Sequence, residues 1–68
     1  MDEDALNMSI RRFLKKVGIT SQREIETAAR ALVEEGRLPQ GSVPVTVTLR
    51  CEELGVEHHV DGELELRD

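Results

Sequence analysis

The chain has 68 residues, which is enough for one small domain. Its 38% hydrophobic and 34% charged residues are typical of a soluble globular protein, and the regular pattern of the apolar residues argues against disorder. The net charge of −5 argues against binding to nucleic acid or to an anionic membrane. So short a chain gains little stability from its own core, and self-association is one common way in which such a core is stabilised.

The first residues, M-D-E-D-A, are acidic and lack the basic and apolar regions of a signal peptide. No apolar run approaches the length of a membrane span. The single cysteine, Cys51, cannot form an intrachain disulfide, so nothing indicates an oxidising compartment. We therefore expect a cytoplasmic protein without a membrane segment.

Two helices are predicted first, over about 4–17 and 22–35. The apolar residues of the first recur at helical spacing on one face: Leu6, Ile10, Phe13, Leu14 and Val17. Gly18 is the type of residue that ends a helix in a left-handed conformation. Ser21 and Glu24 have the spacing of a capping box, which marks the start of the second helix.

The apolar residues of that second helix are Ile25, Ala28, Ala29, Leu32 and Val33, and Gly36 is expected to end it.

Two strands follow, over about 43–51 and 56–66, because the apolar residues there alternate with polar ones. A four-residue loop would place Cys51 opposite Val56 and bring the apolar positions of both strands onto one face. The whole chain is thus expected to be a single α+β domain, 1–68. Its order is ααββ, with a helical hairpin packed on one face of a two-stranded antiparallel β-hairpin.

Cations without any acid among them occupy residues 11–23: Arg11, Arg12, Lys15, Lys16 and Arg23. One interpretation is a docking patch for phosphates or for an acidic protein, and the other is a solvated helix face, which is the usual role of a charged run. An acidic protein surface suits the patch better than DNA, since Phe13 is the only aromatic residue and lies on the predicted core face.

Residues 17–27, V-G-I-T-S-Q-R-E-I-E-T, have a glycine and a capping serine before a helical segment, as a helix-turn-helix does. In that motif the sixth and ninth residues after the turn glycine are buried and apolar, whereas this chain has Glu24 and Thr27 there. The motif also needs a third helix, which no remaining segment supplies. A packed helical joint is therefore the preferred interpretation.

Two further groups of side chains carry atoms that could bind a metal or react. His59, Asp61 and Glu63 share one strand face and have donor atoms suited to a divalent metal, but a solvated sheet face is the preferred interpretation. Cys51 lies on the expected apolar face without a base and an orienting group, so it is expected to be a small hydrophobe. We expect no enzyme activity and no cofactor.

The stretch N-M-S-I-R-R-F-L-K-K-V-G-I-T-S-Q-R-E-I-E, residues 7–26, resembles a family of short bacterial proteins grouped only as a domain of unknown function. Members of that family open with an acidic M-[DN]-E-D segment and end in a Val/Thr-rich hairpin with an acidic tail, so the resemblance covers the whole chain. It implies a small, freestanding bacterial protein and supplies no activity, cofactor or site residue.

The leading hypothesis is a protein-interaction module that binds a protein, or a second copy of itself, through the basic helix face or an open strand edge. The alternative hypothesis is weak nucleic-acid binding through the same cations.

Overall fold

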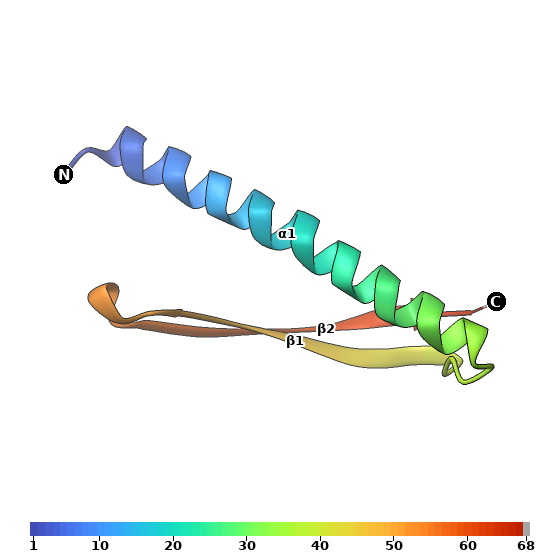
Figure 1. Ribbon diagram of the computed structural model, residues 1–68. Coiled ribbons are helices and arrows are strands. Elements are labelled where there is room, and N and C mark those ends of the chain that lie inside the picture. The colour runs from blue at the N-terminus through green and yellow to red at the C-terminus, as the bar shows by residue number, and fades with distance from the viewer. Residues whose placement is uncertain (68) are drawn as a thin grey trace. The chain divides into compact units, whose positions relative to one another are not determined.

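The computed structural model describes residues 1–67, which form one long helix followed by a β-hairpin (Figure 1). Helix α1 spans Glu3–Glu34, strand β1 spans Gly41–Cys51, and strand β2 spans Val56–Leu66. A single turn of 3-10 helix, η1, occupies Glu52–Leu54 between the strands. The chain divides after Arg37 into two compact units, and each is described by itself.

The α+β class is confirmed, but the predicted helical hairpin is wrong. The helices expected over 4–17 and 22–35 are one continuous helix of 32 residues. Gly18 costs only about 1 kcal/mol in a helix interior, and its φ is not positive, so it does not end α1. Ser21 lies in mid-helix and therefore cannot cap. The predicted packing against the strands and the single domain stay predictions.

The apolar pattern itself explains why the helix continues through Gly18. Apolar positions repeat at intervals of 11 residues across that glycine, as in Leu6, Val17 and Ala28, and again in Leu14 and Ile25. Eleven residues make three turns of about 3.67 residues each, which is close to the α-helical period. The stripe thus stays on one side of a single helix, whereas a break at Gly18 would divide it.

Both ends of α1 are capped. The Asp2 carboxylate accepts a hydrogen bond from the backbone N–H of Ala5 at 3.0 Å, as an N-cap residue does. At the other end Gly36 has φ +68°, a conformation that favours glycine. The N–H of Gly36 donates to the Val33 carbonyl at 3.0 Å, and that of Arg37 to the Leu32 carbonyl at 2.8 Å. These two bonds form a Schellman motif, so the prediction that Gly36 ends the helix is confirmed.

The hairpin has the predicted register. Cys51 pairs with Val56, and the pairing runs without a slip to Gly41 and Leu66. The strand expected over 43–51 begins two residues earlier, at Gly41, and the second strand has the predicted bounds. Gly55, with φ +64°, closes the four-residue loop by donating its N–H to the Glu52 carbonyl at 3.1 Å. The predicted loop length and register are therefore confirmed.

Within residues 1–67 no side chain is buried. A single helix encloses nothing, and a two-stranded sheet leaves both of its faces open. Each unit therefore has an apolar face that lacks a covering layer of its own, and these two faces are the main features of the molecule's surface.

Candidate interaction surfaces

The first surface is the apolar stripe of α1, and its members span most of the helix: Leu6, Ile10, Phe13, Leu14, Val17, Ile25, Ala28 and Leu32. Phe13 is 53% exposed and Leu14 is 50% exposed, although both are large apolar side chains. Monomeric soluble proteins rarely leave a long apolar strip uncovered, so this stripe is a candidate interaction surface.

The five predicted cations all lie on α1, which keeps Arg11, Arg12, Lys15, Lys16 and Arg23 on a single helix. Because the helix is continuous, the spacings of four and eleven residues place Lys16 and Arg23 on the same side as Arg12. None of the five forms an ion pair within residues 1–67. Their charges are therefore available to a partner, and the predicted hairpin would have moved Arg23 to a separate helix.

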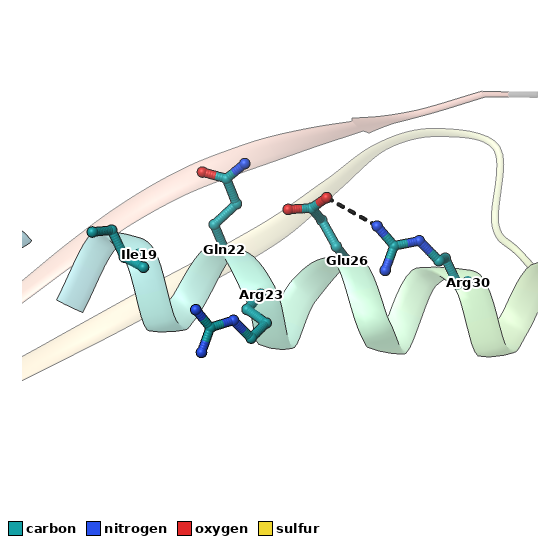
Figure 2. Close-up of a pocket in the computed structure, with 5 residues that line it drawn as sticks. All are labelled: Ile19, Gln22, Arg23, Glu26 and Arg30. Carbon is teal, nitrogen blue, oxygen red and sulfur yellow. Dashed lines mark hydrogen bonds and ion pairs between the residues drawn. The ribbon is translucent and has the colours of Figure 1, made fainter. Parts of the chain in front are cut away.

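A shallow depression lies on the side of α1 near Arg23, and five residues line it: Ile19, Gln22, Arg23, Glu26 and Arg30 (Figure 2). The Arg30 guanidinium donates to the Glu26 carboxylate at 3.2 Å, and both side chains are well exposed. Figure 2 shows Gln22 and Glu26 projecting to one side of the helix and Arg23 to the other. A hollow formed by one helix does not enclose a ligand. It lies beside the basic residues, and its own lining carries both acidic and basic side chains.

The polar face of the hairpin carries the three residues considered for a metal. His59 shares a hydrogen bond with the Thr48 hydroxyl at 3.0 Å, and its Nε2 lies 3.5 Å from Glu57 Oε2. Glu63 accepts a hydrogen bond of 2.7 Å from the Ser42 hydroxyl. Among the described residues, no group of three or more His, Cys, Asp or Glu side chains is placed to hold a metal ion.

Asp61, the third residue of that set, lines a second shallow depression with Pro44, Val45, Thr46, Gly62 and Glu63. On the same polar face Arg50 forms an ion pair with Glu57, with an Nη2–Oε1 distance of 3.0 Å. Hydrogen bonds and an ion pair thus join side chains of the two strands on the polar face of the hairpin, as on a solvated surface.

The second apolar surface is the opposite face of the hairpin, and its apolar residues come from both strands: Val43, Val45, Val47, Leu49, Cys51, Val56, Val60, Leu64 and Leu66. Val47 and Val60 face each other at its middle and are 43% and 50% exposed. Cys51 is half-buried at the end of this face, and its role as a small hydrophobe stays a prediction.

The sequence reasoning found these residues but missed that the apolar stripe is continuous. The repeat of 11 residues was the available signal, because Leu6, Val17 and Ala28 fall on one line only if Gly18 is helical. The depression beside Ile19 was missed for the same reason, since a predicted turn at residues 18–21 removes it.

A family model described as "Family of unknown function (DUF6494)" matches residues 1–67. This match confirms the resemblance to a family of unknown function, while bacterial origin stays a prediction. Comparison with curated proteins found no match. Comparison with solved structures found none either. Across residues 1–67, no helix combines the length and apolar character needed to cross a membrane.

Proposed function

The chain belongs to the family of unknown function DUF6494, which assigns it no activity. From its surfaces we propose that it is a non-enzymatic protein-interaction module. One observation carries the proposal, namely that no side chain within residues 1–67 is buried although both the helix and the hairpin have an apolar face. Such faces gain stability only when another layer covers them.

Most helical stability in proteins comes from packing an amphipathic face, and propensity alone contributes little. An isolated two-stranded hairpin is marginal in water for the same reason. The apolar stripe of α1 and the apolar face of the hairpin are therefore surfaces whose burial on a partner would be strongly favourable.

The non-enzymatic part of the proposal is supported by the shape and chemistry of the surface. An active site normally needs a concave pocket with converging groups. Of the two depressions described above, one is formed by a single helix and the other by two strands. Neither brings a nucleophile together with a base.

Sedimentation velocity of the full chain, combined with far-UV circular dichroism, tests the proposal. We expect a species heavier than the 7.6 kDa chain, or a gain in helical signal when a captured protein partner is added. A chain that stays monomeric, unfolds cooperatively and gains no signal from any protein captured at low salt would contradict it.

A second candidate function, weak nucleic-acid binding, is supported by one observation. The continuous helix aligns Arg12, Lys16 and Arg23, and none of them has an acidic partner within residues 1–67. A gel shift across a salt series tests this candidate, because phosphate contacts weaken steeply with salt. A lack of binding at about 50 mM salt, where such contacts are strong, would remove it.

A further inference from the structure

We propose that residues 5–23 of α1 lie flat on a membrane surface that is rich in anionic lipid. This acid-free segment contains five cations and no Asp or Glu. The inference goes beyond the proposed function, because the partner is a lipid surface and not a protein. Two observations carry it together: an apolar face on one side of the segment, and positive charge that is confined to the same residues.

The charge of the chain is divided unevenly. The acid-free segment has a charge of +5, whereas the other residues, with four cations and 14 acids, have a charge of −10. The net charge of −5, which by itself argues against an anionic membrane, thus conceals a basic surface on one half of α1. Salt screens charge over about 8 Å at physiological ionic strength, so the residues nearest to a lipid surface decide whether it attracts them.

The cations of the acid-free segment differ from others in the chain. Arg30, Arg37 and Arg50 each form an ion pair with a glutamate. None of the five cations in the segment does so within residues 1–67. No carboxylate of the described residues therefore neutralises them by direct contact, and their charge is available to the phosphates of lipid head groups.

The apolar residues of the segment lie on one side of the helix, and cations border that side on both flanks. The members of the apolar stripe within the segment are Leu6, Ile10, Phe13, Leu14 and Val17. At about 100° per residue, Lys16 lies about 100° to one side of Val17, and Arg11 lies about 120° to the other. A helix whose stripe faces the acyl chains thus has a cation on each flank, and the long side chains of Lys and Arg reach the head groups from there.

The acid-free segment ends where an acid enters the line of the stripe. Glu24 follows Leu6 by 18 residues, which is about five turns, so both fall on the same side of α1. An ionised carboxylate is costly to bury among acyl chains, so the membrane-bound part stops before it. Residues 5–23 are about 28 Å long as a helix. A basic polar face opposite a face with Phe and Leu is typical of helices that lie in the membrane interface.

A lipid surface accounts for both sides of the segment. A DNA duplex would contact the cations and leave the stripe uncovered. The only aromatic residue, Phe13, lies on the stripe, so it is not beside the cations to stack on bases. An acidic protein would need an apolar surface bordered by acids on both flanks. The membrane interface has acyl chains and phosphates in that arrangement everywhere, so it is the favoured partner.

Vesicle flotation of the full chain tests the inference. The probes are vesicles of phosphatidylcholine alone and vesicles in which about a third of the lipid is phosphatidylglycerol. We expect the chain to float with the anionic vesicles and not with the neutral ones. Raising the salt from about 0.05 to about 0.5 M should weaken that binding at least about tenfold, because salt screens the attraction. A chain that binds neither kind of vesicle, or both kinds equally, overturns the inference.

Two serine variants test the apolar side of the segment. Leu14 and Ile19 are isomers of nearly equal exposure, 50% and 48%, but Leu14 lies on the stripe and Ile19 on the opposite side of α1. We expect Leu14→Ser to weaken binding to the anionic vesicles at least about tenfold, and Ile19→Ser to weaken it less than about twofold, because only Leu14 enters the acyl region. Far-UV circular dichroism without lipid checks that the variants have equal helix content. Equal losses of binding would overturn the inference.

Two double variants test the basic side. Lys15→Gln with Lys16→Gln, and Arg30→Gln with Arg37→Gln, each remove two cations, so the two variants have the same net charge. Only the first pair lies in the acid-free segment, and the second pair is engaged with glutamates. We expect the first variant to lose at least about tenfold in binding to the anionic vesicles, and the second less than about threefold. Equal losses would assign the binding to overall charge and overturn the inference.

The outcomes separate this inference from the proposed function. A chain that binds no vesicle but associates with a protein overturns the membrane inference and leaves the interaction module intact. A chain that binds no vesicle and shifts a DNA duplex at low salt assigns the cations to nucleic acid and also overturns it. A chain that floats with the anionic vesicles and binds no protein supports the membrane inference and contradicts the proposed function.

Discussion

Single glycines have opposite roles in this chain, and the difference is one of backbone conformation. Gly36 has φ +68° and ends α1, whereas Gly18 has no positive φ and lies inside it. We predict that Gly36→Ala lowers stability by about 1–2 kcal/mol, because an L-residue resists the left-handed region. Gly36→Asn should retain most of the stability, since Asn tolerates that region. Urea unfolding followed by far-UV circular dichroism measures both, and equal losses would contradict this account of the cap.

Asp2 caps the first turn of α1. Its carboxylate holds the Ala5 N–H at 3.0 Å, and the acids of the first turn also favour the helix dipole. Asp2→Ala should cost about 1 kcal/mol of helix stability, while Asp2→Ser should cost little, because serine also caps well. Amide exchange at Ala5 reports the effect directly. Unchanged exchange in the alanine variant would mean that the cap contributes nothing.

Among the elements, the hairpin offers a paired test. Arg50 lies opposite Glu57, and their side chains form an exposed ion pair at 3.0 Å. Arg50→Glu should destabilise the hairpin by about 0.5–1 kcal/mol, because like charges then face each other across the strands. The double variant R50E/E57R should recover part of that loss. A full double-mutant cycle in urea measures the coupling, and a coupling of zero would show that the pair contributes nothing.

The two elements also differ in how far the sequence predicts them. The hairpin was predicted to the residue at Val56 and Leu66, because a slip of one position would place the apolar residues of a strand on the wrong face. No comparable penalty applies to the helix. Gly18 and the Ser21–Glu24 spacing are typical of a helix boundary, so they predict two helices. The 11-residue apolar repeat, which continues past both, predicts a single helix. The cations were found from composition, but their alignment depended on the helix being continuous.

At the scale of the whole molecule, one property connects these parts: the chain has apolar faces on both units and no buried side chain within residues 1–67. Under the proposed function a protein with this surface gains stability from association, so its folding and its binding would form a single equilibrium. Self-association is one common way in which so short a chain is stabilised, but the composition specifies neither the partner nor the surface that binds it.

That linkage predicts a melting temperature that depends on protein concentration. For a dimer whose unfolding enthalpy is about 0.7 kcal/mol per residue, a hundredfold increase in concentration should raise the Tm by roughly 10 °C. The chain has no Trp or Tyr, so far-UV circular dichroism is the suitable probe. A monomer melts at one temperature at every concentration, so the dependence of Tm on concentration reports association directly. If the unaltered chain melts at one temperature across that range, its stability does not come from pairing with a second copy.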